Sequence, residues 1–184
     1  MEKSETPRIA SVYALLHDLV YILVVICLLF VFVVRFVTVS GPSMQPTLQD
    51  GNAVMLLSNF LCGDYESGDI VVATVPTFDD ARPIVKRVIA TEGQVVYINF
   101  VTGTVLVDGE MIEEPYIAEP TYLDYDDGLS YPVTVPEGCV FLMGDNRNDS
   151  ADSRYAPIGC VDTQYILGKV ILRTWPLRGF GTIK

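Results

Sequence analysis

The sequence predicts a mainly β protein, in which an antiparallel β-sheet or barrel domain follows a single N-terminal transmembrane helix. Three observations predict it: an uncharged apolar run at residues 19–34, short β-branched runs after it, and glycine-containing turns between those runs. With 184 residues, of which 50% are hydrophobic and 19% charged, the chain can form one domain with a core plus an appendage. Its net charge of −11 argues against a nucleic-acid-binding protein, because such proteins usually carry a basic surface.

The run from Leu19 to Val34 has no charged residue, and two more apolar residues follow Arg35. A transmembrane helix needs about 20 apolar residues, and an arginine at its end can reach the lipid–water interface. We therefore expect a cytoplasmic segment at residues 1–18, an anchor helix at 19–37 and an extracytoplasmic β-rich domain at 38–184.

A buried core helix and a cleavable signal peptide are the alternatives for this run. Apolar side chains on every side of the helix fit lipid better than a core, and the length of the run argues against a signal peptide. Lys3 and Arg8 precede the run, whereas Arg35 alone follows it closely, which favours a cytoplasmic N-terminus. His17, the only histidine, is then separated from the β-rich domain.

The part after the anchor contains short runs of β-branched residues bounded by Gly, Pro and Asp, which predict strands. These runs are Ala53–Leu57, Asp69–Val75, Ile84–Ala90, Gln94–Asn99, Thr104–Val107, Cys139–Met143 and Ile166–Leu172. Glu92-Gly93, Asp108-Gly109 and Glu137-Gly138 predict turns, and the second of these predicts a hairpin. The segment 113–136 is acidic and rich in Tyr and Pro, which is compatible with a solvated excursion or with a specificity or partner loop.

Residues 40–48, SGPSMQPTL, form a turn that could present a serine nucleophile. Gly41, Pro42 and Pro46 prevent regular structure there, so that Ser43 and neighbouring backbone N–H groups can be exposed. Acyl transfer needs a nucleophile together with donors for the oxyanion. By itself, however, a serine in a Gly/Pro turn is compatible with a turn residue alone.

Two lysines are candidates for a general base. As strand residues, Lys86 lies on one face between Ile84 and Val88, and Lys169 lies between Leu167 and Ile171. Burial of such a face would lower the pKa of the amine and provide a neutral base. Periodicity does not choose between the two, and the C-terminal Lys184 is a poor candidate.

The run GDNRNDSADSR, residues 144–154, follows an apolar strand and is dense in polar groups. It could be a solvated loop or a scaffold in which Asp152 pairs with Arg154. Its spacing lacks the glycine and terminal glutamate of an EF-hand calcium loop. The cysteines beyond the anchor, Cys62, Cys139 and Cys160, are compatible with one disulfide plus a free thiol or with three free thiols.

Taken together, these pieces resemble the type I signal peptidases, or leader peptidases, a family of membrane-anchored Ser–Lys proteases also called S26. The resemblance rests on the anchor, SGPSMQPTL, Gly68-Asp-Ile-Val-Val72, Lys86-Arg-Val-Ile with Glu92-Gly93, and GDNRNDSADSR, which occur in the family's order over residues 19–175. The short connection between the lysine motif and the last motif resembles the compact, Gram-positive-like bacterial form.

The resemblance implies a role for each matching residue. Ser43 matches the nucleophile and Lys86 the general base, which resolves the choice between the two lysines. Ser150 matches the serine that hydrogen-bonds the base, Asp152 and Arg154 match the supporting pair, and Asp145 heads the same scaffold. Shallow substrate pockets are expected at Val37, Val39, Met44, Leu48, Ile84 and Val85. The backbone N–H of Ser43 would bind the oxyanion, and Gly41 stands where part of the family has a second, serine donor.

The function that the resemblance implies is removal of N-terminal signal peptides from secreted preproteins that carry small residues at the −1 and −3 positions. The expected enzyme is a single-pass protein of the plasma membrane that contacts lipid and needs no metal, cofactor or nucleic acid. The alternatives are a non-enzymatic membrane-anchored β domain and a LexA-like Ser–Lys autoprotease. A sortase-like cysteine transpeptidase would need a histidine beside its cysteine, and His17 lies across the membrane.

Overall fold

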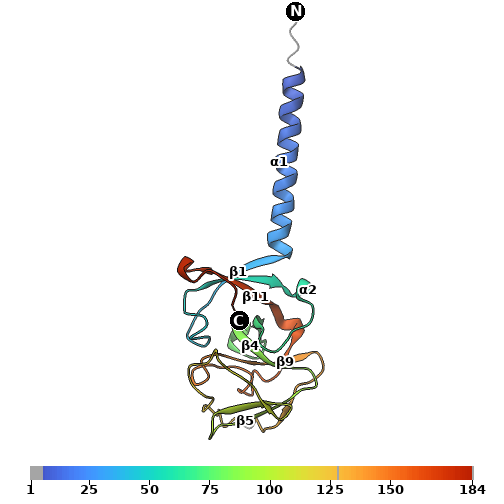
Figure 1. Cartoon of the computed structure of the whole chain (residues 1–184). Coiled ribbons are helices and arrows are strands. Elements are labelled where there is room, and N and C mark those ends of the chain that lie inside the picture. The colour runs from blue at the N-terminus through green and yellow to red at the C-terminus, as the bar shows by residue number, and fades with distance from the viewer. Residues whose placement is uncertain (1–5, 128, 184) are drawn as a thin grey trace, which may run out of the picture.

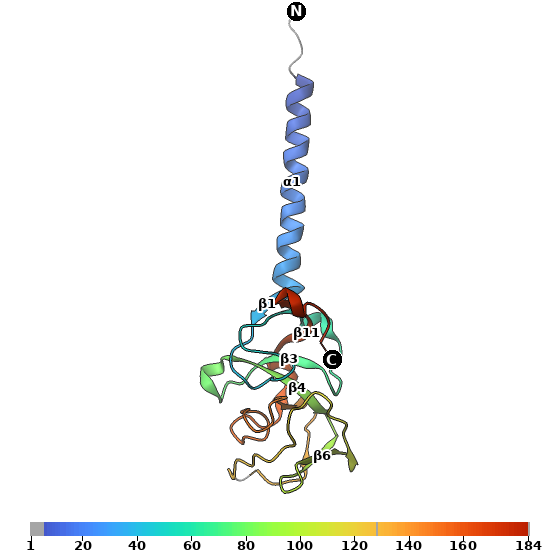
Figure 2. The same cartoon turned by 60° about the vertical axis from the view of Figure 1, so that its left-hand side comes forward.

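A computed structural model describes residues 6–127 and 129–183, so Lys3 and Lys184 lie outside the described residues. A single long helix, α1 (Thr6–Phe32), projects from one end of a β-rich domain (Figures 1 and 2). Within it, Ala10–Phe32 is long and apolar enough to cross a membrane, and none of this stretch is buried against the rest of the protein.

The helix differs from the expected anchor at both ends. It begins before residue 19, because the residues from Ala10 to Leu16 are also mostly apolar. It ends at Phe32 rather than at Val37, because the next residues form strand β1 (Val34–Thr38), which pairs antiparallel with β2 (Ala53–Ser58). The β-branched pair Val33-Val34 suits this change from helix to strand.

Most of the domain is one curled antiparallel sheet in the order β1-β2-β11-β3-β4-β9-β10, which confirms the mainly β fold class. Its remaining strands are β3 (Ile70–Thr74), β4 (Pro83–Thr91), β9 (Cys139–Met143), β10 (Val161–Asp162) and β11 (Ile166–Trp175). The short helix α2 (Asn59–Cys62) follows β2, and 3-10 turns occur at Asp79–Ala81, Thr163–Tyr165 and Leu177–Gly179.

A second, four-stranded sheet lies at the end of the domain farthest from α1 (Figures 1 and 2). It contains β5 (Val95–Asn99), β6 (Thr104–Val107), β7 (Glu110–Met111) and β8 (Val133–Thr134). The predicted hairpin joins β6 to β7 through Asp108 and Gly109, whose φ angles of 53° and 84° are those of a type I′ turn.

The hydrophobic core fixes the position of residues 39–48, the segment that follows β1. Val39 before Ser43, and Met44 and Leu48 after it, are buried in one hydrophobic cluster with Val54 and Leu56, so the segment is fixed on both sides of Ser43. Other apolar clusters lie under residues 151–161 and between β9 and the four-stranded sheet. The three cysteines beyond the anchor are free thiols, so no disulfide contributes to the described part of the domain.

Candidate active site

The loop that carries Ser43 is held from both sides. Gly41 has a φ of 89°, a conformation that favours glycine, and its N–H donates to Asp50 (2.9 Å). On the other side, the carbonyl of Ser43 accepts a hydrogen bond from the N–H of Asn146 (3.0 Å), and the Asn146 amide donates to the carbonyl of Pro42 (3.2 Å). The serine is therefore fixed between the core and residues 144–154.

Lys86 lies on β4, where it is opposite Val71 of β3, and its side chain is only 4% exposed. Its Nζ is 2.7 Å from Ser43 Oγ. Burial lowers the pKa of Lys86 to about 8, while the charges of Asp152 and Asp145 raise it and that of Arg154 lowers it further. A substantial fraction of this amine is therefore neutral near physiological pH and within proton-transfer distance of one hydroxyl.

The other candidate base, Lys169, is placed differently. Its Nζ forms an ion pair with Asp69 at 2.6 Å, and its side chain is 32% exposed. Lys169 is thus partly exposed and ion-paired, whereas Lys86 is buried against Ser43, so geometry separates the two lysines that periodicity could not separate.

Asp152 is the centre of the supporting scaffold behind Lys86. Arg154 binds both of its carboxylate oxygens at 2.8 Å, and the N–H of Gly144 donates to Oδ2 (2.9 Å). Burial disfavours the charge of Asp152, but the charge and hydrogen bonds of Arg154, and the bond from Gly144, keep its pKa below the usual value. A fixed carboxylate therefore faces the amine, as the sequence predicts for the Asp152–Arg154 pair.

Ser150 is close to this centre but differs from its expected role. Its hydroxyl donates to Asp152 Oδ2 (2.8 Å), whereas the hydrogen bond of Lys86 goes to Ser43. Within the described residues, Ser150 thus acts on the lysine through Asp152. Packing here is tight, because a side chain at Gly144 would come within 2.6 Å of Ser150 atoms and of the Ser43 carbonyl.

Asp145 holds two residues that the sequence analysis did not assign. Arg87 binds both of its oxygens, at 2.8 and 2.7 Å, and Thr47 donates to Oδ2 at 2.5 Å. Arg87 directly follows Lys86, and Thr47 lies in SGPSMQPTL. Each is a polar residue among mostly apolar neighbours, and this was the feature of the sequence that could have identified it as part of the site. Through their bonds to Asp145, Arg87 and Thr47 connect strand β4, the loop that carries Ser43 and residues 144–154.

A hollow of about 220 Å³ opens beside Ser43 and Lys86 between the end of β1 and the start of β4. Four of the six expected substrate residues line it: Val37, Val39, Ile84 and Val85. Met44 and Leu48 do not line it, because both are fully buried in the core. The expectation for these two residues came from the resemblance, and their burial in the core corrects it.

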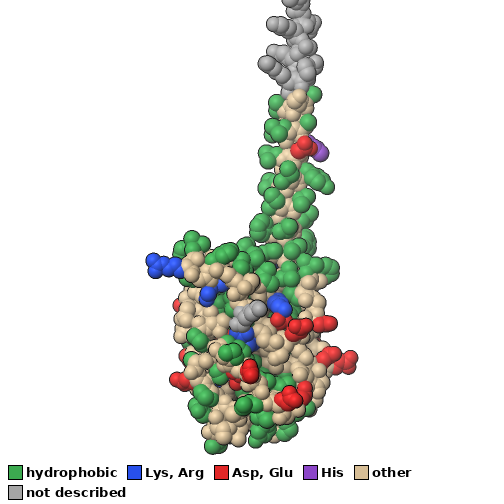
Figure 3. Space-filling model, viewed as in Figure 1, with side chains coloured by type: hydrophobic (Ala, Val, Ile, Leu, Met, Phe, Trp, Pro, Cys, Tyr) green, Lys and Arg blue, Asp and Glu red, His purple; other side chains and the backbone are tan. Residues whose placement is uncertain are grey.

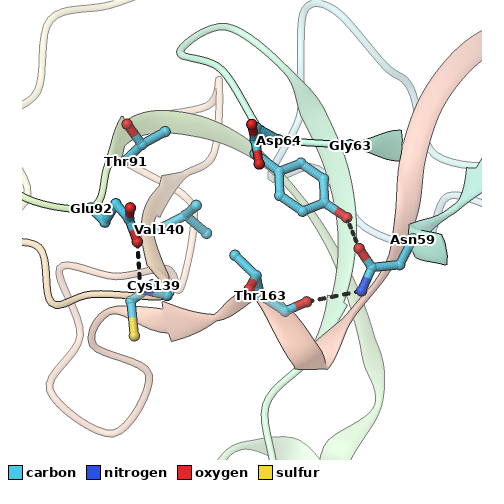
Figure 4. A pocket seen from close by; sticks show the side chains of 10 residues that line it. Asn59, Gly63, Asp64, Thr91, Glu92, Cys139, Val140 and Thr163 are labelled. Atoms are coloured by element: carbon cyan, nitrogen blue, oxygen red, sulfur yellow. Dashed lines mark hydrogen bonds between the residues drawn. The ribbon is translucent and has the colours of Figure 1, made fainter. Parts of the chain in front are cut away.

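A larger hollow of about 400 Å³, shown in Figure 4, lies elsewhere and contains neither Ser43 nor Lys86. Its polar groups bond to one another: Asn59 donates to the Thr163 carbonyl (3.1 Å), and Glu92 accepts from the N–H of Gly138 (2.8 Å). The thiol of Cys139 beside it has a pKa raised by burial, which disfavours the nucleophilic thiolate. The smaller hollow is therefore the candidate active site.

Comparison with known proteins agrees with this geometry. Residues 12–175 match the family described as "Signal peptidase, peptidase S26". The chain belongs to this family.

Relatives within this signal peptidase family come from several bacteria. The "Probable signal peptidase I-2" of Synechocystis sp. is 35% identical over 160 residues, which cover 83% of this chain and 68% of the relative. "Signal peptidase IB" of Staphylococcus aureus is 33% identical over 183 residues, which cover 90% of this chain and 92% of the relative. A crystal structure of a signal peptidase I from Enterococcus faecalis covers 58% of this chain and 96% of that chain, with 28% identity and a TM-score of 0.48.

Membership of the S26 signal peptidases confirms the resemblance read from the ordered motifs and the expectation of a peptide-bond hydrolase. This membership excludes the alternative of a non-enzymatic β domain. The roles of individual residues in this chain stay predictions, which the geometry above makes specific.

Proposed function

We propose that this chain is a membrane-bound serine endopeptidase that removes signal peptides from secreted preproteins, with Ser43 as nucleophile and Lys86 as general base. The observation that carries the proposal is the 2.7 Å separation of Lys86 Nζ and Ser43 Oγ, with the lysine 4% exposed. A Ser–Lys pair needs a neutral amine, and burial provides one without a histidine.

In the acylation step, neutral Lys86 removes the proton of the Ser43 hydroxyl as Oγ attacks the carbonyl carbon at the cleavage site. The C=O electrons move to oxygen, and the N–H of Ser43, which has no partner among the described residues, donates to the oxyanion. When the tetrahedral intermediate collapses, the C–N bond breaks and protonated Lys86 gives its proton to the leaving amine.

In the deacylation step, the same lysine, neutral again, removes a proton from a water molecule. Hydroxide adds to the ester carbonyl, the bond to Ser43 Oγ breaks, and Lys86 returns the proton to the serine. Asp152 and Asp145 stabilise the ammonium formed in each step, because both carboxylates are buried near the amine. Arg154 and Arg87 hold these carboxylates in place.

The hollow beside the dyad accounts for the proposed preference for small residues at −1 and −3. A peptide laid as an extra strand between residues 37–40 and 83–86 would place alternate side chains toward Val37, Val39, Ile84 and Val85. These four residues give the hollow of about 220 Å³ apolar walls, which suit small apolar side chains such as alanine.

The proposed location is the plasma membrane, with α1 as the single span, the N-terminus in the cytoplasm and the catalytic domain outside. Figure 3 shows hydrophobic side chains gathered on the domain where α1 emerges. The elements at this end of the domain are β1, α2, the end of β11 and the turn that follows it (Figure 1). Their exposed apolar residues, here called the apolar rim, are Phe36, Phe60, Trp175, Leu177 and Phe180. Contact of the rim with lipid would keep the active site where the apolar part of a signal peptide ends.

The test is cleavage of a preprotein by the full-length enzyme in detergent, with Ser43→Ala compared with wild type. We expect loss of at least a thousandfold in rate for Ser43→Ala and wild-type rates for Ser130→Ala, which removes a hydroxyl from an exposed serine. Retained cleavage by Ser43→Ala would refute the assignment of the nucleophile.

A further inference from the structure

The acidic, tyrosine-rich segment that the sequence analysis left open lies against the loop that supports Lys86. Its residues 113–127, here called the strap, contact residues 147–156 at several points along both segments. This excludes a freely solvated excursion, because Thr121 in its middle is fully buried.

The first attachment is Arg147, which is 1% exposed. Its NH1 lies 2.5 Å from Glu114 Oε1 and donates to Thr121 Oγ1 (3.1 Å). Between these two strap residues, the ring of Tyr116 stacks 3.9 Å from the guanidinium of Arg87. The beginning of the strap is therefore fixed over the residue that follows the base.

The second attachment is the side chain of Asn148, which uses both ends of its amide. Its Oδ1 accepts from the N–H groups of Tyr122 and Leu123, at 2.9 and 3.1 Å. Its Nδ2 donates to Glu119 Oε2 and to the carbonyl of Pro120, both at 3.1 Å. One asparagine thus fixes the backbone of the strap in the middle.

The third attachment reaches the scaffold of the dyad. The hydroxyl of Tyr125 donates to the backbone carbonyl of Ser150 at 2.5 Å, and its ring packs on Tyr155 with centroids 5.1 Å apart. Burial raises the pKa of Tyr125, so the hydroxyl keeps the proton that it donates. Two residues further, Asp127 accepts from the N–H of Ala156 (2.6 Å).

Ser150 is therefore held from two sides. Tyr125 binds its carbonyl, and its own hydroxyl binds Asp152, the fully buried carboxylate that faces Lys86. Only one residue, Ala151, separates the bond to the strap from this carboxylate. A change in the position of Ser150 would move Asp152 and open the space behind the amine.

We propose that the strap is part of the catalytic machinery of this chain and that Tyr125 is a positioning residue, which acts through Ser150 and Asp152 to keep Lys86 dry and aligned with Ser43. This inference rests on the proposed function of the dyad. Tyr125 contacts neither substrate nor reacting atoms, so its effect belongs to the base rather than to binding.

The test is the Tyr125→Phe variant, which keeps the ring and removes the hydrogen bond to Ser150. Ser43 is hydrogen-bonded to Lys86, and the charged groups that act on the lysine are Asp152, Arg154 and Asp145. Loss of the Tyr125 hydrogen bond should loosen these groups and admit water to Lys86. Because desolvation is the largest cause that lowers the pKa of Lys86, this pKa should then rise. The acid limb of kcat/KM then shifts upward, and each shift of one unit lowers the rate on that limb about tenfold.

We expect Tyr125→Phe to shift the acid limb by about half a unit to one unit, with a three- to tenfold loss of kcat at pH 7 and KM within about twofold of wild type. KM should hold because the hollow is lined by residues 37–43 and 79–86, away from the strap. Asn148→Ala removes the second attachment of the strap and should shift the acid limb of kcat/KM in the same direction. Tyr97→Phe removes the hydroxyl of an exposed tyrosine on β5 and should change neither quantity.

An acid limb in Tyr125→Phe that coincides with wild type would overturn the inference, as would an equal fall in rate at every pH. Thermal unfolding of the three variants separates the positioning role from general destabilisation, because instability lowers active enzyme without moving the limb. Ser43→Ala distinguishes this outcome from failure of the proposed function: an inactive Ser43→Ala with an unshifted Tyr125→Phe would remove the strap from the mechanism and leave the dyad in place.

Discussion

Single residues decide the chemistry here through burial of charge. Burial disfavours the ammonium of Lys86, which is 4% exposed, and this suits Lys86 to its proposed role of base, whereas Lys169, on a similar strand pattern, is a partly exposed ion-pair partner. The difference lies in what covers each strand face. Lys86 lies beneath Ser43 and the residues around Asp152, and such covering elements come from distant parts of the chain.

The first prediction concerns pH. Because burial lowers the pKa of Lys86 to about 8 and the mechanism needs the neutral amine, kcat/KM should rise with pH and level off above about 8. An ordinary lysine would place this limb more than two units higher, near the model-peptide value of about 10.4. Preprotein cleavage measured from pH 5 to 10, with Lys86→Ala as the inactive reference, tests this, and a limb above pH 10 would contradict a desolvated base.

The second prediction concerns the buried ion pair of Arg87 and Asp145, whose side chains are 1% and 0% exposed. Asp145→Ala leaves the guanidinium buried without its partner, so it should destabilise the fold by about 3–5 kcal/mol. The matched control is Arg82→Ala, which breaks the exposed pair with Asp79 and should cost less than about 1 kcal/mol. Denaturant unfolding of the full chain in detergent measures both, and equal losses would contradict the argument from burial.

Among the elements, the β6–β7 hairpin gives a prediction that separates folding from catalysis. Gly109 has a φ of 84°, where a Cβ is unfavourable, so Gly109→Ala should destabilise the domain by about 1–2 kcal/mol. Glu110→Ala, the next and exposed position, should have little effect on stability. Cleavage at a permissive temperature should stay near wild type in both variants, because the hairpin shares no residue with the hollow at Ser43. A large loss of activity in folded Gly109→Ala would contradict this separation.

Most of the strands could be predicted from sequence because they depend on local patterns, whereas the two-residue strands β8 and β10 were not predicted. Runs of β-branched residues bounded by Gly, Pro and Asp predicted seven strands close to their observed bounds, and Asp108-Gly109 predicted a hairpin turn that the structure contains. Strand β1 was missed because its apolar residues continue the pattern of the helix, and its strand state depends on pairing with β2.

Parts of the site that depend on tertiary contacts could not be predicted. The segment 113–127 reads as a solvated loop because its partners, such as Ser150 for Tyr125, lie 25 residues away and bind through backbone atoms. The resemblance implied pocket positions for Met44 and Leu48, which lie in the core instead, because an apolar residue in a sequence does not show what covers its side chain. The resemblance implied Lys86 as the partner of Ser150, whereas the observed partner is Asp152, which depends on the tertiary arrangement of the loop.

For the whole molecule, the distribution of charge and apolar surface indicates how the domain lies relative to the bilayer. Four cations of the domain, Lys86, Arg87, Arg147 and Arg154, are buried, against two buried carboxylates, Asp145 and Asp152. The solvent-exposed surface is therefore somewhat more acidic than the net charge of −11 alone suggests. The apolar rim around the base of α1 interrupts this acidic surface (Figure 3). Attraction of this rim to the membrane is therefore expected to depend mainly on apolar burial.

The last prediction uses the only tryptophan of the chain, Trp175, which is 57% exposed on the rim. If the rim lies in the lipid interface, full-length enzyme in phospholipid vesicles should show blue-shifted Trp175 emission, quenched by bromine atoms on the upper part of the acyl chains, because Trp prefers this depth. The matched control is the double variant Trp175→Phe and Val101→Trp. It moves the only tryptophan to the exposed position after β5, in the sheet farthest from α1 (Figure 1), where neither blue shift nor quenching is expected. Similar emission and quenching at the two positions, or no quenching at Trp175, would mean that the domain stands clear of the bilayer and that α1 alone holds the enzyme at the membrane.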